Sequence, residues 1–140
     1  MDREALNRFG DRVGYSEEDL ESIPQGDSRT RHIGNIAKVA ASYSIEAKLV
    51  KSIHCNSGYR VGDRFVLDVD GNFIGKLCPK KLCVYAISQL AIPVALINER
   101  LSEGLSPNEF HFMHNVRCLD VGVECKGYGG IMMEVKVIPR

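Results

Sequence analysis

The residues of this chain best suited to chemistry are its cysteines, all of which lie in the last two thirds of the sequence. They are Cys55, Cys78, Cys83, Cys118 and Cys125. Thiolates are soft ligands that select zinc or iron-sulfur clusters, and such a site needs three or four of them close together. An odd number of cysteines in a chain long enough to have its own core argues against a disulfide framework. The alternatives are therefore metal binding, a reactive thiol, or thiols that are simply buried.

Whether these thiols meet depends on the strands that carry them. A period-two apolar pattern predicts a first strand over residues 45–54, and the Asp70-Gly71 turn predicts a hairpin over residues 64–77. The same alternation predicts a third strand over residues 110–116. It also predicts a last strand that points Ile131, Met133, Val135 and Val137 inward. Four main strands joined in this way make a small antiparallel sheet.

Helices are predicted both before and after the first strand in the sequence. Ser16 is placed to cap a short helix that ends before Pro24, and the apolar spacing from Ile33 to Ala40 predicts a second short helix. Pro79 suits the first turn of a helix, because its missing amide hydrogen costs nothing there. The segment from Pro79 to Glu103 is therefore predicted to be one long helix that Pro93 kinks.

Following the direction of these elements brings the thiols to one end of the sheet. Cys55 closes the first strand, Cys118 closes the third, and Cys125 lies in the loop that leads to the last strand. Cys78 is predicted to sit at the same end, at the start of the long helix, where the helix dipole lowers the pKa of a thiol and makes it more reactive. The position of Cys83 is left open between the site and the core. The predicted metal ligands are thus Cys55, Cys78 and Cys118, with Cys125 as a possible fourth.

Three short motifs carry a resemblance to a known family. They are Cys55-Asn56-Ser57-Gly58-Tyr59-Arg60-Val61-Gly62-Asp63, then Cys78-Pro79, then Cys118-Leu119-Asp120. In this order the chain resembles a family of small uncharacterised prokaryotic proteins with a C-x-x-G-[HY]-[KR]-x-G-D, C-P and C-x-D pattern, in a longer subgroup with an N-terminal extension. The resemblance covers roughly residues 45–139. It supports the choice of Cys55, Cys78 and Cys118 and implies no particular activity.

The composition of the chain indicates which partners and which cell compartment are expected. Eighteen basic residues balance eighteen acidic ones, so nothing favours nucleic acid as a partner. The charged N-terminus does not look like a signal peptide, and the apolar stretch from Leu82 to Ile97 is too short to span a bilayer. We therefore expect a cytoplasmic protein with no membrane contact, in which residues 1–30 form a helical appendage and linker and residues 31–140 form the main domain.

The same stretch, Leu82 to Ile97, is apolar nearly all round, more than a helix on one side of a sheet needs. This surplus predicts cover from the N-terminal helices, a second copy or another protein. The fold expected is α+β, with a small antiparallel sheet packed on one long kinked helix and preceded by a short helical appendage. The leading prediction is a small metal-binding protein, with zinc or an iron-sulfur cluster, or an accessory protein. The alternatives are a thiol-dependent enzyme that uses Cys78, with Asp120 or Glu124 nearby, and a non-catalytic subunit that binds a larger enzyme through its apolar helix.

Overall fold

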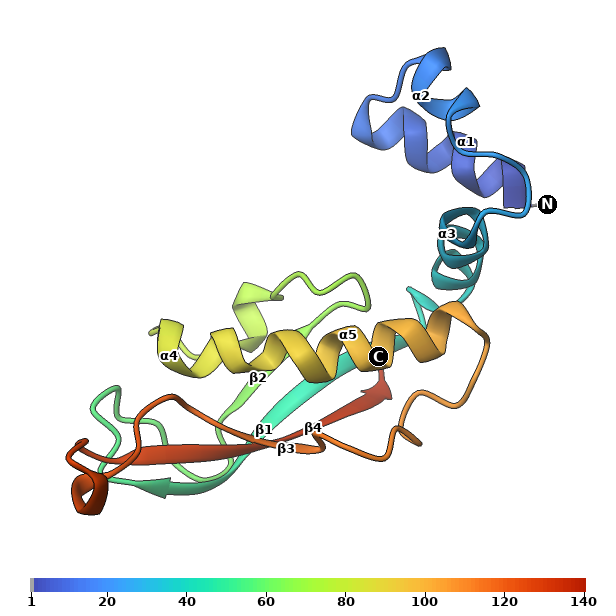
Figure 1. The fold of residues 1–140 in the computed structure, drawn as a ribbon. Helices are drawn as coiled ribbons and strands as arrows, with labels where there is room; N and C mark the ends of the chain where they lie inside the picture. Colours follow the sequence, from blue (N-terminus) through green and yellow to red (C-terminus); the bar gives the residue numbers. More distant parts are fainter. Residues whose placement is uncertain (1) are drawn as a thin grey trace.

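A four-stranded antiparallel sheet and one helical run form the body of the protein in the computed structural model, which describes residues 2–140 (Figure 1). The strands are β1 Tyr43–Ile53, β2 Arg64–Leu67, β3 Asn115–Arg117 and β4 Gly130–Pro139. They lie in the order β2-β1-β4-β3, and all neighbouring pairs are antiparallel. The α+β fold predicted from the sequence is confirmed.

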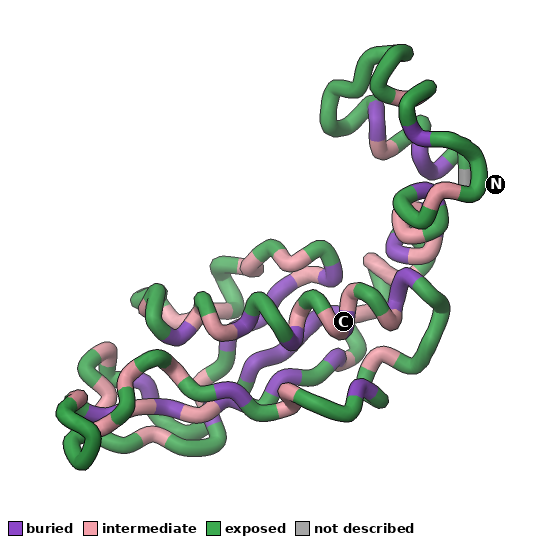
Figure 2. The backbone as a smooth tube through the Cα atoms, viewed as in Figure 1, coloured by how far each residue is buried: buried purple, intermediate pink, exposed green. Residues whose placement is uncertain are grey.

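The core lies between one face of this sheet and the helical run (Figure 2). In β4 the alternation is the one predicted, because the four residues expected to point inward are all buried. They are Ile131, Met133, Val135 and Val137. Opposite them in β1, Ile45, Ala47 and Leu49 are fully buried. Alternating apolar residues on two paired strands therefore supply the sheet side of the core.

The helical run comprises α4 Val84–Ile87, the 3-10 turn η2 Ser88–Leu90 and α5 Ala91–Ser102. The run is interrupted at Ser88–Leu90, just before Pro93, because proline removes one helix hydrogen bond and its ring crowds the carbonyl group four residues earlier. The prediction that this helix starts at Pro79 was wrong. The Tyr59 hydroxyl accepts the Cys83 N–H (2.8 Å) and donates to the Lys81 carbonyl (2.6 Å), two backbone groups that a longer helix would need.

A β-bulge divides β1 into two halves of opposite phase. The register shifts between Leu49, which pairs with Met133, and Lys51, which pairs with Met132. After this extra residue Ser52 takes the inward position opposite Ile131, and Ile53, predicted to point inward, is 49% exposed. The bulge therefore turns a polar residue toward the end of the sheet where the cysteines lie.

Two further strand predictions are only partly correct. The hairpin expected over residues 64–77 keeps β2, but its second arm shrinks to a single bridge between Leu67 and Phe73, followed by the 3-10 turn η1 Gly75–Leu77. The third strand contains only Asn115–Arg117, not residues 110–116. Before it, His114 stacks on Phe110 with ring centroids 4.0 Å apart, so this segment folds back on itself instead of extending.

The N-terminal part consists of α1 Asp2–Val13, α2 Glu17–Glu21 and α3 Ser28–Val39. Ser16 caps α2 in a complete capping box with Asp19, as the sequence predicted for this cap. Helix α1 packs on α3, and α3 packs on α5 near its C-terminal end. The expected boundary at residue 30 falls in the first turn of α3, so α3 belongs to both the appendage and the main body.

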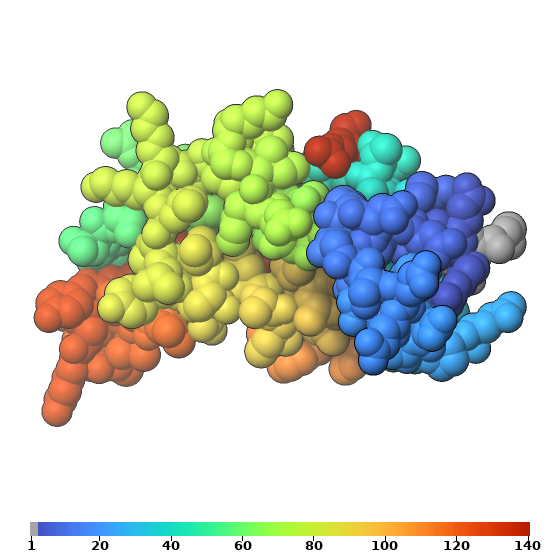
Figure 3. Space-filling view, turned by 90° about the horizontal axis from the view of Figure 1, so that it is seen from above, coloured from blue at the N-terminus to red at the C-terminus, as the bar shows by residue number. Residues whose placement is uncertain are grey.

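This arrangement covers only one end of the helical run. Figure 3 shows the N-terminal helices over one end of the molecule, while α4 and the loop before β4 lie uncovered at the other end. Leu82, Val84, Tyr85 and Ile92 are each more than half exposed. The predicted apolar surplus is therefore present, and the appendage leaves much of it open. No helix within residues 2–140 is long and apolar enough to cross a membrane.

Candidate functional site

Three cysteines line one pocket at the end of the sheet where β1 and β3 finish and the helical run starts. They are Cys55, Cys83 and Cys118, and the pocket has a volume of about 600 Å³. Cys55 follows β1 in a turn closed by a Gly58 N–H to Cys55 carbonyl bond of 3.0 Å. All three side chains are half-buried and reduced. Cysteines from three separate segments of the chain thus line one cavity. Four cysteines were predicted to share this end of the sheet, and two of them, Cys55 and Cys118, lie in this pocket.

Tyr59 fixes the position of Cys83. The Tyr59 ring is buried and packs edge-on against Phe65, with ring centroids 5.4 Å apart. Its hydroxyl holds the backbone on both sides of Leu82 through the two hydrogen bonds to Lys81 and Cys83. Burial raises the pKa of Tyr59, which keeps the hydroxyl protonated and able to donate to Lys81. Cys83 is therefore anchored directly to the core.

Cys83 occupies the N-cap position of α4, at the start of the helical run. Burial acts to raise the pKa of its thiol, but the Ser57 hydroxyl and the amides of Ala86 and Tyr85 outweigh it, so the pKa is lowered. The side chain makes no cap hydrogen bond of normal geometry, so we attribute the effect of the amides to the field of the helix start. The surroundings of Cys83 thus favour its thiolate form.

Cys118 and Asp120 form the opposite side of the pocket. The Cys118 sulfur accepts the Ile131 N–H at 3.4 Å, which ties the end of β3 to β4. The Asp120 carboxylate accepts three backbone N–H groups, from Gly122 (3.0 Å), Tyr128 (2.9 Å) and Gly129 (3.2 Å). These bonds lower the pKa of Asp120. The carboxylate is already engaged in holding the loop over residues 120–129, so it serves this loop rather than acting as an acid or base.

The remaining two cysteines lie outside this pocket. Cys78 lies beside β2, where its sulfur accepts the Val66 N–H (3.3 Å) and donates to the Val66 carbonyl (3.5 Å). The prediction that Cys78 stands at the helix start was wrong, because the helix starts five residues after Pro79 and Cys83 takes that place. Cys125 ends the 3-10 turn η3 Val123–Cys125, is exposed, and lines a neighbouring hollow with Lys51 and Glu124.

No group of three or more His, Cys, Asp or Glu side chains within residues 2–140 is arranged to hold a metal ion as the side chains stand. The four predicted ligands are divided among three places: Cys55 and Cys118 in the pocket, Cys78 at β2 and Cys125 in the hollow. Metal binding by these four residues stays a prediction that would require the chain to rearrange.

Exposed apolar side chains that we call the apolar collar lie in and next to the pocket. We define it as Leu82, Val84, Tyr85, Leu119 and Tyr128, whose exposed fractions run from 52% to 80%. Val84, Tyr85 and Tyr128 line the pocket itself, Leu82 precedes Cys83, and the Leu119 N–H donates to the Tyr85 carbonyl at 3.1 Å. An exposed apolar group of this kind next to a cavity is typical of an interaction surface.

Sequence reasoning missed the part played by Cys83, Ser57 and Tyr59. The Tyr59 contact joins residues 24 positions apart, so no local pattern shows it. The sequence did contain one signal for a later helix start. Two lysines follow Pro79, and the apolar run in which Cys83 lies begins only after them. No family model matches the chain, and no curated protein or solved structure gives a significant match. The resemblance described from the three motifs therefore stays a prediction.

Proposed function

We propose that this protein acts through the thiol of Cys83, which attacks disulfides that enter the pocket shared with Cys55 and Cys118. The observation that carries the proposal is that three thiols from three chain segments line one cavity, with one of them at the start of a helical run. A thiolate is the attacking species in thiol–disulfide exchange, and a helix start favours it.

The reaction has two steps in which atoms and electrons balance. The Cys83 thiolate attacks one sulfur of the substrate disulfide, a mixed disulfide forms, and the other substrate sulfur leaves as a thiolate. A second pocket thiol, Cys55 or Cys118, then loses its proton to water and attacks the Cys83 sulfur. This step releases the second substrate thiolate and leaves a disulfide within the protein. The substrate is reduced by two electrons, and an external dithiol must reduce the protein again.

The size and surroundings of the pocket support an organic substrate. A volume of about 600 Å³ lies within the range of roughly 300–1,000 Å³ that small-molecule sites have, whereas a closed structural metal site needs far less space. The apolar collar would contact apolar groups on either side of the substrate disulfide. Reduced cysteines with these roles suit the cytoplasm, which is where we propose that the protein works.

Binding of a soft metal ion is the second candidate, favoured by the same three thiols. Zinc takes cysteine sulfur ligands at about 2.3 Å, and zinc sites with three protein ligands keep one position open. The ligands would be Cys55, Cys83 and Cys118, so Cys83 replaces Cys78 in the set predicted from the sequence. An iron-sulfur cluster would need a fourth ligand, and the cysteines left for it are Cys78 and Cys125, which precede Cys83 and follow Cys118 in the chain.

The test uses 5,5′-dithiobis(2-nitrobenzoate), an aromatic disulfide that releases a coloured thiolate. The starting protein carries Cys78→Ser and Cys125→Ser, so that only the pocket thiols remain. With one equivalent of the reagent per chain, we expect fast release of about two thiolates per chain, about one when Cys55 and Cys118 are both replaced by serine, and loss of the fast release in Cys83→Ser. Equal rates with and without Cys83 would overturn the proposal.

Metal analysis of the wild-type protein, purified without oxygen or chelator, separates the second candidate from the first. Stoichiometric zinc that is lost in each of the single variants Cys55→Ser, Cys83→Ser and Cys118→Ser, together with slow disulfide reduction, would replace the first proposal by the second. Cys125→Ser is the matched control, because this thiol lies outside the pocket.

A further inference from the structure

The end of the molecule that holds the thiol pocket carries an excess of positive charge, although the chain as a whole has none. Residues 51–63, 80–86 and 117–132 include all the residues that line the thiol pocket and the neighbouring hollow, and we call these three segments the thiol end. They contain three acidic residues and six basic ones. The basic residues are Lys51, Arg60, Lys80, Lys81, Arg117 and Lys126. Positive charge is therefore concentrated at the thiol end.

The six basic side chains of the thiol end are all exposed. None of them forms an ion pair within residues 2–140, where every ion pair involves a basic residue from another part of the chain. Two of the three carboxylates are bonded to backbone N–H groups instead. Asp63 accepts the Arg60 N–H at 2.9 Å, and Asp120 holds its loop through three such bonds. Contact with carboxylates therefore does not cancel the positive charge.

Two of these basic residues, Lys51 and Arg117, stand in one row across the outer face of the sheet. Lys51 in β1 and Arg117 in β3 both pair with Met132 of β4, which lies between them. Neighbouring strands are about 4.8 Å apart, so the two Cα atoms are separated by roughly 10 Å. Both residues line the hollow, which has a volume of about 760 Å³. A carboxylate that lies over Met132 is within reach of both of these long side chains.

The hollow is continuous with the thiol pocket. His54, Tyr128, Gly130 and Ile131 line both of them, so the two cavities share one wall. A substrate whose disulfide lies beside Cys83 can therefore extend across this wall into the hollow. The position of the two cavities thus connects the reacting thiol with the pair of basic residues on the outer face.

Glu124 is the one carboxylate among the residues that line the hollow. It is exposed and forms no ion pair with Lys51 or Arg117. An anionic group in the hollow therefore meets two positive charges and one negative charge from the lining residues. The sign of the effect of Glu124 is opposite to that of the two basic residues, so its removal should strengthen the binding of an anion.

We propose that the substrates of the Cys83 thiol are small disulfides that carry carboxylates, with the disulfide in the thiol pocket and a carboxylate in the hollow between Lys51 and Arg117. This inference rests on the thiol–disulfide reaction proposed above, whose steps it leaves unchanged, and it names the substrate class. Unpaired positive charge around a cavity raises the rate at which an anionic substrate arrives, and salt screens this effect.

The test compares 6,6′-dithiodinicotinate with its neutral diamide, two disulfides that share one ring system and differ in charge. The rate constant of each reagent with the Cys78→Ser, Cys125→Ser protein is divided by its rate constant with 2-mercaptoethanol, which removes the difference in intrinsic reactivity. We expect this quotient to be at least about tenfold larger for the dinicotinate at low ionic strength, and the preference to fall as salt is added.

Equal quotients for the two reagents, with reduction of both by Cys83, would overturn this inference and leave the thiol reaction standing. Failure of the protein to reduce either reagent would overturn the thiol reaction and the inference with it. A preference for the dinicotinate that does not change with salt would also refute the inference, because recognition by exposed charges must be screened.

Three variants locate the recognition. The double variant Lys51→Gln, Arg117→Gln should lower the preference for the dinicotinate at least about twofold, and Glu124→Gln should raise it. Lys38→Gln is the matched control, because Lys38 is an exposed lysine of α3 that lines neither the pocket nor the hollow, and it should leave the preference unchanged. An unchanged preference in the double variant, or an equal fall in Lys38→Gln, would refute the assignment to the hollow.

Discussion

Replacing Tyr59 by phenylalanine removes one oxygen atom from the contact that holds the start of the helical run. The buried ring stays, but the Cys83 N–H and the Lys81 carbonyl lose their partner. Each hydrogen bond contributes about 1 kcal/mol net, so Tyr59→Phe should lower the free energy of unfolding by about 2 kcal/mol. Urea unfolding followed by circular dichroism measures this change. The matched control is Tyr85→Phe, an exposed tyrosine, which should change stability by less than about 0.5 kcal/mol.

The same variant has a local and a pH-dependent signature. Hydrogen exchange of the Cys83 amide should become fast, because its acceptor is gone. Burial raises the pKa of Tyr59 in the folded state, so the stability that this neutral group gives is complete below its ordinary pKa of 10.0 and is lost as the pH rises through the folded value. The wild type should lose this stability at high pH and Tyr59→Phe should not. A loss of under about 0.5 kcal/mol with unchanged Cys83 exchange would refute the role given to Tyr59.

Three further outcomes follow from the site. Gly129→Ala should lower the free energy of unfolding in urea by at least about 2 kcal/mol, because the new Cβ would stand 2.2 Å from the His54 carbonyl oxygen. In the control Gly75→Ala the new Cβ meets nothing within 4 Å, so the free energy of unfolding should change little. Equal losses of stability in the two variants would contradict this packing. Ser57→Ala should move the midpoint of Cys83 alkylation by iodoacetamide to higher pH, because the Ser57 hydroxyl lowers that pKa, and an unmoved midpoint would exclude the contact. Asp27→Asn should be less stable than the wild type at neutral pH, because Arg29 lowers the pKa of Asp27 to about 2 and the wild-type carboxylate stays charged. The plots of unfolding free energy against pH for the two proteins should meet as the pH falls toward 2. A difference in stability that persists at pH 2 would show another cause.

The sequence predicted those elements whose signals are local and periodic. The alternation in β4 and in the first half of β1, and the capping box at Ser16, arise from residues within a few positions of each other. Strand direction alone was enough to bring Cys55 and Cys118 to one end of the sheet. The strand pattern and the strand direction can both be read from neighbouring residues, and the pattern is well defined where one face of the sheet is buried.

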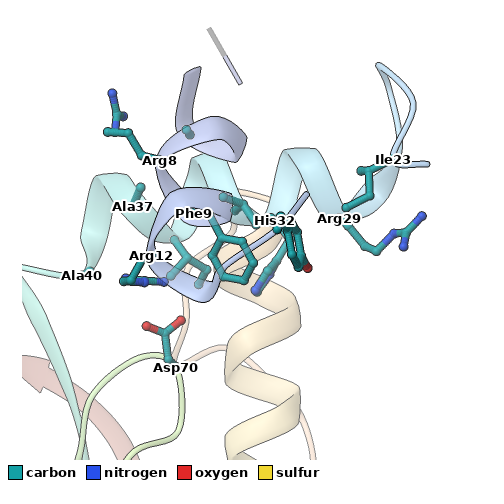
Figure 4. A pocket seen from close by; sticks show the side chains of 13 residues that line it. Arg8, Phe9, Arg12, Ile23, Arg29, His32, Ala37, Ala40 and Asp70 are labelled. Atoms are coloured by element: carbon teal, nitrogen blue, oxygen red, sulfur yellow. The ribbon is translucent and has the colours of Figure 1, made fainter. Parts of the chain in front are cut away.

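The failures share a different cause, which is contact between distant segments. The helix starts at Val84 because a tyrosine from another loop takes the backbone groups that would have extended it. As a result Cys78, which looks like a helix start in the sequence, lies against Val66, and Cys83 takes the position expected for it. A cavity of about 530 Å³ between α1 and α3 (Figure 4) was missed for the same reason, because these helices form it only after they pack together.

The extra residue at the bulge of β1 divides this strand into a part that builds the core and a part that supports the thiol pocket. Up to Leu49 its inward side chains belong to the core, and after the bulge the inward side chain is Ser52, whose hydroxyl donates to the Tyr59 carbonyl at 2.7 Å. Removing Val50 would give a regular strand in which Lys51 and Ser52 keep their partners Met132 and Ile131, so Ser52 would still point inward. The bulge can therefore lose its extra residue without moving any strand pair on either side of it, so the scaffold and the thiol end of the sheet are joined at a place that tolerates a change in length.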